Sequence, residues 1–412
     1  MLTLKKGMLR GNGIRISFAS LIPGLVVLNI FLLPPSVVSI LFPLPGNSAI
    51  TLLFMLCYVL YLLKLRSVTF LPNVINWCCA VQIAGWLFLC VYHADSSYIT
   101  RITYLVATYI GLVCLRNIAG GFLTFVKMYD TVILLMCIGG CLTFFGVFLF
   151  NMQPIRLYEN LDTRTGYFFG LSCTNMLIGN IIRYSGFFDE PGAIAAWGMV
   201  ALLYNHLVYK NIKFENILII ALVFTFSFAY YIQLFFFLIF FRIKKLSVII
   251  ALSGVVLIGV IGLNSLKDTE YHAVYKLTVG RTEKTDAGTF AGDNRSNLME
   301  NALKVFNQHK LLGLGATNSM NANDYFGDNP VTPFAIDGII GGLILYLPLL
   351  IMMMNAKTKT LKYVIIILVI GYLQRPFSCF FIYFISIYLF EVLFIDKKQF
   401  SLEGSAPRVK AI

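Results

Sequence analysis

Residues 16–63 read ISFASLIPGLVVLNIFLLPPSVVSILFPLPGNSAITLLFMLCYVLYLL, which is 48 consecutive positions without a charged residue. Further charge-free runs cover Ser67–Tyr92, Thr131–Ile155, Asn216–Phe241 and Leu246–Leu266. Because about 20 apolar residues span a bilayer as a helix, each run is long enough to cross at least once. The runs lack sustained alternation of polar and apolar residues, which excludes a membrane β-barrel. We therefore expect an all-α polytopic membrane protein.

The composition points to the same class of protein. Of the 412 residues, 58% are hydrophobic and only 12% are charged, whereas a soluble domain has about 25% charged residues. A net charge of +13 could suggest a nucleic-acid partner, but the basic residues are segregated. Loops on one side of the predicted helices hold 20 basic and 4 acidic residues, against 12 basic and 14 acidic on the other. An excess of Lys and Arg marks cytoplasmic loops, so both termini are expected inside and no nucleic acid is expected as a partner.

The charge pattern also predicts the organisation of the chain. It favours a single membrane domain over residues 1–412, with about 12 transmembrane helices (range 10–14) and a cytoplasmic tail at 399–412. The run Asn216–Phe241 must cross twice, yet its 26 residues make only about 39 Å of helix. This predicts a short or re-entrant pair turning near Ser227–Tyr230, with the turn covered by protein or facing water. Residues Asn117–Asp130 are expected to form a cytoplasmic link.

Two predicted outer loops, 151–189 and 264–332, are much longer than ordinary connections and are the expected place for chemistry. The first ends in RYSGFFDEP, residues 183–191, and leads directly into a predicted helix. Glu190 would lie at the positive end of that helix, with Pro191 in its first turn. A helix cap with an interfacial aromatic belt explains these residues as well as an active site does. Arg183 could bind a pyrophosphate in a bidentate manner at the membrane surface.

The second outer loop contains Arg281 and then Arg295, which precedes a predicted amphipathic helix with a capping-box-like start at Asn297. An arginine beside the free N–H groups of a helix start is typical of an anion site, although a surface helix with an ordinary salt bridge fits equally well. His309 follows this helix and could act as a general base, but a lone loop histidine is more often structural. The nearby Gly313 and Gly315 do not form a nucleotide-binding loop.

Polar residues also flank the last helices. Asp328 and Asn329 precede a helix that Asp337 is expected to open, and the glycines at 338–342 are expected to allow close helix packing. Arg375 interrupts an apolar segment, where a charge is costly unless it faces a partner or a cavity. It could bind a lipid phosphate or lie in an exposed turn. Neither the nine cysteines nor the four histidines show zinc-site spacing, so no metal is expected.

Three motifs, taken in order, resemble the bacterial O-antigen and capsule polymerases of the Wzy type, and more distantly the O-antigen ligases. They are residues 183–191 before a central helix, Asn294-Arg295 before a loop helix ending in HKLLGLG (309–315), and Asp328-Asn329 ahead of GIIG (338–341). They cover about the second half of the chain. The segment Gly315–Asp337 has no histidine where ligases usually carry one, which favours a polymerase.

The resemblance implies a metal-independent glycosyltransferase without a cofactor, in the bacterial cytoplasmic (inner) membrane. It would join undecaprenyl-diphosphate-linked repeat units into O-antigen, capsule or exopolysaccharide on the outer face, among membrane lipids and beside a chain-length regulator and a flippase of the same pathway. The catalytic candidates are Glu190, Arg295 and Asp328, and the candidates for binding diphosphate or glycan are Arg183, Arg281, Arg375, Asn329 and His309.

Two alternatives remain open at this stage. A ligase would transfer finished glycan to the lipid A core. A lipid-linked oligosaccharide flippase or transporter would usually show two similar halves and ionisable residues inside its spans. Here the charges concentrate in two outer loops instead.

Overall fold

The fold is that of a computed structural model, which describes residues 18–42, 44, 46–160, 164–243, 261–269, 272–277, 279–283, 296–320, 327–356, 358–377, 380 and 384–386. Its helices are α1 (Phe18–Leu32), α2 (Val38–Leu41), α3 (Asn47–Leu63), α4 (Asn73–His93), α5 (Ser97–Arg116), α6 (Gly121–Phe150), α7 (Pro191–Tyr204), α8 (Ile212–Val223), α9 (Phe228–Phe237), α11 (His272–Leu277), α12 (Ser296–Gln308), α13 (Ala316–Met320), α14 (Thr332–Asn355) and α15 (Lys359–Gln374). Two π-helical segments, Asn205–Tyr209 and Leu238–Arg242, continue α7 and α9, and a 3₁₀ turn covers Val279–Thr282.

Long apolar helices dominate the structure, as the sequence predicts for a membrane protein. Within the described ranges, five helices are long and apolar enough to cross a bilayer: α4, α5, α6, α7 with its π-helical extension, and α14. Shorter apolar helices cover Ser20–Leu32, Asn47–Leu63 and Phe228–Arg242. The membrane class is therefore confirmed, whereas the count of about 12 helices stays a prediction. The tail 399–412 lies outside the described residues.

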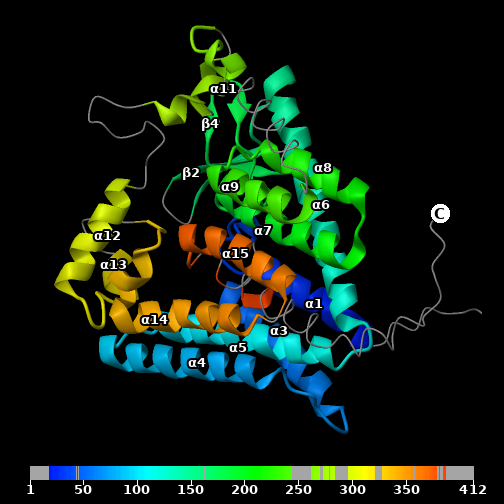
Figure 1. The fold of residues 1–412 in the computed structure, drawn as a ribbon, viewed down its shortest axis with the longest axis vertical. Coiled ribbons are helices and arrows are strands. Elements are labelled where there is room, and N and C mark those ends of the chain that lie inside the picture. The colour runs from blue at the N-terminus through cyan, green and yellow to red at the C-terminus, as the bar shows by residue number, and fades with distance from the viewer. Residues whose placement is uncertain are drawn as a thin grey trace, which may run out of the picture.

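The helices pack in two groups (Figure 1). In the lower half of that view α14 lies beside α4, and α4 packs on α5, which in turn packs on α3. Above them, α7 contacts α6, α8 and α9. Helices α12 and α13 lie against α14, at the left-hand end of the view. We call this end of the bundle the loop end. The connection between α4 and α5 lies there, α7 and α14 begin there, and α15 ends there.

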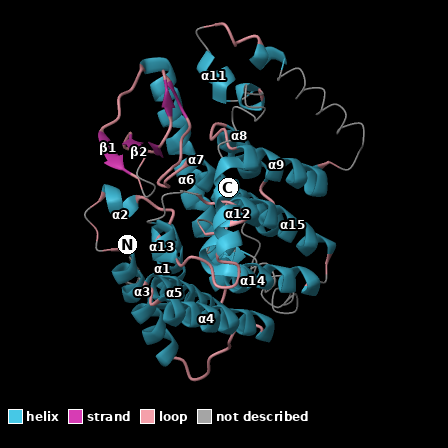
Figure 2. Cartoon of the chain, turned by 90° about the vertical axis from the view of Figure 1, so that its left-hand side faces the viewer, coloured by secondary structure: helices cyan, strands magenta, loops and turns pink. Residues whose placement is uncertain are grey.

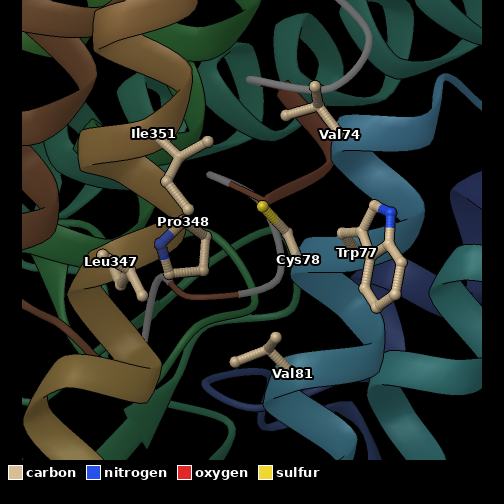
Figure 3. A pocket seen from close by; sticks show the side chains of 7 residues that line it. All are labelled: Val74, Trp77, Cys78, Val81, Leu347, Pro348 and Ile351. Carbon is tan, nitrogen blue, oxygen red and sulfur yellow. The ribbon is translucent and has the colours of Figure 1, made fainter.

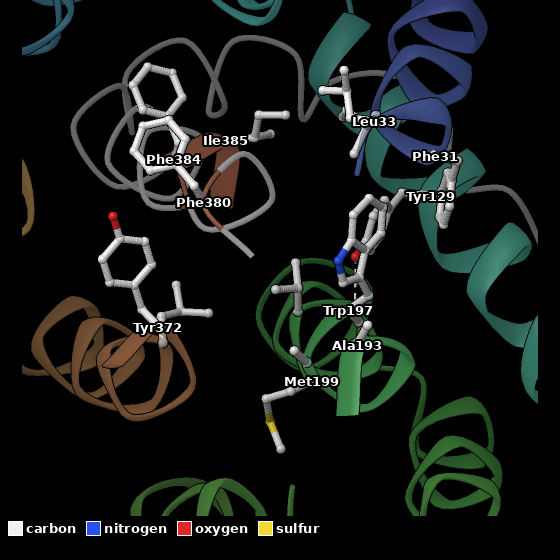
Figure 4. Close-up of a cluster of buried hydrophobic side chains, with 14 of the residues drawn as sticks. Phe31, Leu33, Tyr129, Ala193, Trp197, Met199, Tyr372, Phe380, Phe384 and Ile385 are labelled. Atoms are coloured by element: carbon white, nitrogen blue, oxygen red, sulfur yellow. Dashed lines mark hydrogen bonds between the residues drawn. The ribbon is translucent and has the colours of Figure 1, made fainter. Parts of the chain in front are cut away.

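Helix α7 forms the centre of the molecule. Every residue from Pro191 to Tyr204 is buried, and glycine and alanine occupy much of the helix, which allows neighbours to approach closely. In Figure 4, Trp197 of α7 lies beside Phe31 of α1 and Tyr129 of α6, and the ring centroids of Phe31 and Trp197 are 5.0 Å apart. Tyr129 donates its hydroxyl hydrogen bond to the Trp197 carbonyl at 2.9 Å. The neighbouring helices therefore hold α7 in place, and with it the residues at its start.

The predicted short pair is present as α8 and α9, joined by a turn at residues 224–227. The turn lies at the predicted position, because Ser227 is the residue before α9. Thr225 and Ser227 are both buried, so protein covers the irregular backbone, as an apolar environment requires.

The predicted link at Asn117–Asp130 is wrong over most of its length, because α6 begins at Gly121 and runs for 30 residues. Phe125, Val126 and Tyr129 are fully buried and follow the helical period, which outweighs the charges of Lys127 and Asp130. The link is reduced to residues 117–120. There the Asn117 carboxamide makes two hydrogen bonds, both of 2.9 Å, with the backbone of Thr69 in the α3–α4 connection.

The predicted loop 151–189 contains strands, which the all-α prediction did not include. Strands β1 (Arg156–Glu159), β2 (Thr165–Phe168) and β3 (Cys173–Thr174) form an antiparallel sheet, and β4 (Leu177–Ile178) pairs with β5 (Ile181–Ile182). Tyr158 and Cys173 pack with Val37 and Leu41 in a small second core beside α2. In Figure 2 β1 and β2 lie near α2, and the Arg156 guanidinium donates to the Leu41 carbonyl at 2.7 Å.

Candidate active site

The central feature of the loop end is an ion pair between Glu190 and Arg375. Glu190 precedes α7 with an extended backbone (φ −151°, ψ 158°), and its side chain makes no capping hydrogen bond to the helix. Its Oε1 instead pairs with Nη1 of Arg375, the residue that follows α15. Arg375 is only 5% exposed. The interpretation of Arg375 as an exposed turn is therefore wrong, and its buried charge has a partner.

Gly192 leaves the space that the Arg375 guanidinium occupies. A Cβ atom at residue 192 would lie 2.6 Å from Nη2 and 2.9 Å from both Cζ and Nε of Arg375. The guanidinium thus lies directly on the first turn of α7. The N-terminal turn of a helix carries free N–H groups and a partial positive charge. Two positive groups therefore meet at one carboxylate, an arrangement that suits an anion.

A second arginine lies near the same carboxylate. Nη2 of Arg164, the residue before β2, is 3.8 Å from Oε2 of Glu190, and the Arg164 side chain is 54% exposed. Sequence analysis did not single out Arg164, since a lone arginine in a polar stretch has no local signature. Here it adds positive charge on the solvent side of Glu190.

Asp328 approaches the same place from the start of α14. Its Oδ1 accepts a hydrogen bond from the backbone N–H of Phe377 at 3.5 Å, two residues beyond Arg375. The neighbouring Asn329 is 2% exposed, and its Oδ1 accepts from the Val331 N–H at 2.9 Å. Asn329 thus shapes the turn that leads into α14. Among the candidates, Glu190, Arg375 and Asp328 are brought to one turn, residues 375–377.

The other predicted residues lie elsewhere. Nε of Arg183 donates to the Thr225 carbonyl at 3.1 Å, so Arg183 contacts the α8–α9 turn. His309 follows α12 and is exposed, and its carbonyl accepts from the Gly313 N–H at 2.9 Å. Arg281 lies in the 3₁₀ turn Val279–Thr282, with its side chain outside the described part. Arg295 lies outside the described residues altogether.

One pair of charged residues at the loop end was missed by sequence analysis. Asp337 lies within α14 directly before a break at Gly338 (φ 68°, ψ −168°), where the helix kinks and its longer second part begins. It therefore precedes that part, as expected, and is 1% exposed. Its carboxylate accepts hydrogen bonds from the Tyr98 hydroxyl at 2.6 Å and from Arg101 Nη1 at 2.8 Å. The only sequence signal was a lone arginine in the first turns of an apolar helix.

The break in α14 interlocks with the segment after α12. Gly313 (φ 72°) packs on the Ile336 carbonyl, and Gly338 packs on the Leu311 carbonyl, so closely that a side chain on either would overlap backbone. The Leu314 N–H donates to the Ala335 carbonyl at 3.0 Å. Gly338 thus allows a close approach, but the approach is to the segment after α12, whereas the sequence predicts close packing between helices for the glycines at 338–342.

The α4–α5 turn fastens this region to the bundle. Asp95 accepts hydrogen bonds from the Thr317 N–H at 2.7 Å and the Thr317 hydroxyl at 2.8 Å, and another from the Ser97 N–H at 2.9 Å. Burial alone raises the pKa of Asp95, but these hydrogen bonds outweigh it and lower the pKa to about 2. The His93 ring adds a contact, with Nε2 lying 2.8 Å from the Leu312 carbonyl.

An apolar groove between α4 and α14 is shown in Figure 3, lined by Val74, Trp77, Cys78, Val81, Leu347, Pro348 and Ile351. Its lining carries no ionisable carboxyl or basic group, so we do not place the chemistry there. In the described part of the chain, no three or more His, Cys, Asp or Glu residues are grouped so that they could hold a metal ion.

No protein-family model matches the chain, and no curated protein matches its sequence.

Proposed function

We propose that the protein is a polymerase that joins lipid-diphosphate-linked oligosaccharide repeat units on the outer face of the bacterial cytoplasmic membrane. The observation that carries this proposal is the Glu190–Arg375 pair on the first turn of α7. It combines a carboxylate, a buried guanidinium and a helix N-terminus at one end of a bundle of apolar helices. The motif resemblance of residues 183–191 and 328–341 supplies the substrate class.

The chemistry is a displacement at the anomeric carbon of the donor sugar. A hydroxyl of the acceptor sugar attacks this carbon, and the bond between the carbon and the diphosphate oxygen breaks. The electron pair leaves with the lipid diphosphate, and the hydroxyl proton passes to a carboxylate. Catalysis then depends mainly on stabilising the negative charge that develops on the leaving diphosphate.

The residues of the loop end suit these roles. A diphosphate can compete with Glu190 for Arg375, because guanidinium and the helix N–H groups both bind phosphate oxygens. Glu190, once displaced from Arg375, becomes available to accept the hydroxyl proton. Asp328, on the other side of the 375–377 turn, is the second carboxylate that could take this role. Arg164 extends the positive charge towards the solvent.

The proposal is tested by surface glycan and lipid-linked intermediates in cells that lack the protein. Wild type should restore a ladder of long glycans, whereas Arg375→Ala and Glu190→Gln should leave glycans with one repeat unit. Lys304→Ala is the matched control, since Lys304 is an exposed cation on α12 whose side chain is 61% exposed. It should restore the full ladder.

The same experiment separates the alternatives. Long chains that accumulate on the lipid carrier would indicate a ligase. Single repeat units retained on the cytoplasmic face would indicate a flippase and would exclude an active site at the loop end. A full ladder with Arg375→Ala, at normal protein level, would exclude the role of the ion pair.

A further inference from the structure

The position of Arg375 is decided by a turn rather than by a helix. Arg375 follows α15 with a non-helical backbone (φ −144°, ψ 67°), and Pro376 and Phe377 come next. Its guanidinium lies against the positive end of α7, which repels it, so the Glu190 carboxylate and the surrounding packing must keep it in place. A residue that holds the 375–377 turn would therefore control the site.

We propose that Arg101 is a positioning residue, which holds this turn so that Arg375 faces the leaving diphosphate. The inference rests on the proposed function and deepens it. The Cζ atom of Arg101 lies 4.6 Å from the centroid of the Phe377 ring. It also lies 4.9 Å from the ring centroid of Tyr98, one turn earlier on α5. Both distances are those of cation–π contacts, and a planar guanidinium can also stack on a ring, which an ammonium group cannot do.

Asp337 fixes the direction of the Arg101 side chain. Its Oδ2 accepts from Arg101 Nη1 at 2.8 Å, while its Oδ1 accepts from the Tyr98 hydroxyl at 2.6 Å. Because Asp337 is 1% exposed and bound on both oxygens, it has little freedom to move. The Arg101 side chain is 20% exposed, so most of it is packed between its partners.

The break in α14 explains why Asp337 can serve this purpose. The helix changes direction at Gly338, where φ is positive, directly after Asp337. Gly341 leaves room for the Asp337 side chain, because a Cβ atom at 341 would overlap it. Gly338 and Gly341 thus allow the Asp337 carboxylate to lie beside α5. The proposed reaction by itself would not require glycine at these positions.

The 375–377 turn is consequently held from two sides. Arg101 stacks on the Phe377 ring, and Asp328 accepts from the Phe377 N–H. Phe377 transmits both contacts to Arg375, two residues earlier. Since a displacement of about 1 Å at a reacting group can lower a rate about 100-fold, loosening the turn should lower turnover without removing substrate contacts.

The test measures kcat and KM with purified protein in proteoliposomes that contain lipid-diphosphate-linked repeat units. Arg101→Ala should lower kcat about 10- to 100-fold and change KM for donor and acceptor by less than about twofold. Phe377→Leu should lower kcat similarly, and the double variant should fall no further than the single ones. Thr317→Ala is the matched control, because it loosens α13 at the loop end without contact with the turn.

Several results would overturn the proposal. One is a wild-type kcat in Arg101→Ala. Another is a double variant whose loss of kcat is the product of the two single losses. The third is a loss of kcat in Arg101→Ala that is no larger than the loss in Thr317→Ala. If Arg101→Ala does not accumulate in membranes, Arg101→Lys gives the same comparison, since lysine keeps the charge opposite Asp337 but stacks poorly on Phe377. Wild-type kcat in that variant would overturn the proposal.

The polymerase function and the positioning role of Arg101 would be refuted by different results. If wild type does not lengthen lipid-linked glycans, the proposed function is wrong and this inference falls with it. If wild type is active and Arg375→Ala is inactive, but Arg101→Ala keeps its kcat, only the role of Arg101 is wrong.

Discussion

At the scale of single residues, the site depends on a buried arginine, Arg375, that is paired with the carboxylate of Glu190 beside a helix N-terminus. A buried charge without a partner would be very costly, and Glu190 provides that partner for Arg375. The pair is not permanent in the proposed reaction, because the diphosphate replaces the carboxylate. In the proposed reaction the two residues that pair in the resting protein also provide the chemistry.

Gly192→Ala tests the position of Arg375 without changing any charge. The new Cβ atom would lie within 3 Å of the guanidinium and push it off the first turn of α7. Activity should fall about 10- to 100-fold. Stability should fall as well, by about 1–3 kcal/mol, because the new atom overpacks a buried site and weakens the Glu190–Arg375 pair. The measurement is polymerisation in proteoliposomes together with thermal unfolding.

Gly46→Ala is the control for that prediction. A Cβ atom at residue 46 meets nothing within 4 Å, and its φ of −52° is allowed for alanine. This variant should keep wild-type activity. Full activity of Gly192→Ala would mean that the guanidinium does not need its present position.

Asp95→Asn tests how the α4–α5 turn holds α13. The hydrogen bonds from Thr317 and Ser97 keep the pKa of Asp95 at about 2, below its ordinary value of 3.8. A carboxyl whose pKa is lowered by folding stabilises the protein fully above its unfolded pKa and loses this effect as the pH falls through the folded pKa. At neutral pH the variant should be less stable by about 1–2 kcal/mol.

The pH dependence provides the decisive comparison. Thermal unfolding in detergent should show a constant difference between wild type and Asp95→Asn above about pH 4, and this difference should shrink as the pH falls towards 2. A difference that grows on acidification would contradict the assignment.

At the scale of elements, some helices could be predicted from the sequence, whereas the start of α6 and the strands of 151–189 could not. The α8–α9 pair was predictable from the run Asn216–Phe241. The basic residues on both sides of this run favour the same face of the membrane, and the run is too short for two full-length helices. The start of α6 was misread because Lys127 and Asp130 outweighed the helical period of the buried residues beside them. The strands of 151–189 were hidden because each is only two to four residues long.

The interlock of the α12–α13 connection with α14 is the second element-scale feature. Gly313→Ala and Gly338→Ala should each destabilise the protein by about 3 kcal/mol or more, since both residues have positive φ and both would overlap backbone. Thermal unfolding checks this. Gly262→Ala is the control, because a Cβ atom there meets nothing within 4 Å. Stability equal to wild type in Gly338→Ala would contradict the interlock.

At the scale of the whole molecule, hydropathy and charge predicted the membrane class but could not show which distant residues meet. Glu190 and Arg375 are 185 positions apart, and Arg101 and Asp337 are 236 apart. The sequence placed Glu190 and Asp337 at helix starts, but it did not show which arginine each would meet. Asp328 and Arg375 were candidates and do share a turn, whereas Arg183 contacts the α8–α9 turn instead. Pairing at this range depends on tertiary packing, which local patterns do not encode.

Orientation in the membrane is a whole-molecule prediction as well. In a variant with its native cysteines replaced by serine, Lys304→Cys on α12 should react with a membrane-impermeant thiol reagent from outside the cell. Ser67→Cys in the α3–α4 connection should react only after the membrane is permeabilised, because the basic residues around it favour the cytoplasm. The reverse labelling would place the loop end in the cytoplasm and exclude the proposed reaction.

The most direct test of the central claim is the stoichiometry of lipid diphosphate release. Purified protein in proteoliposomes is given a repeat unit labelled in the sugar and in the lipid diphosphate. We predict that one lipid diphosphate is released for each new glycosidic bond, and that Arg375→Ala abolishes both events together. Movement of repeat units across the bilayer without bond formation, or lengthening without release of lipid diphosphate, would contradict the account.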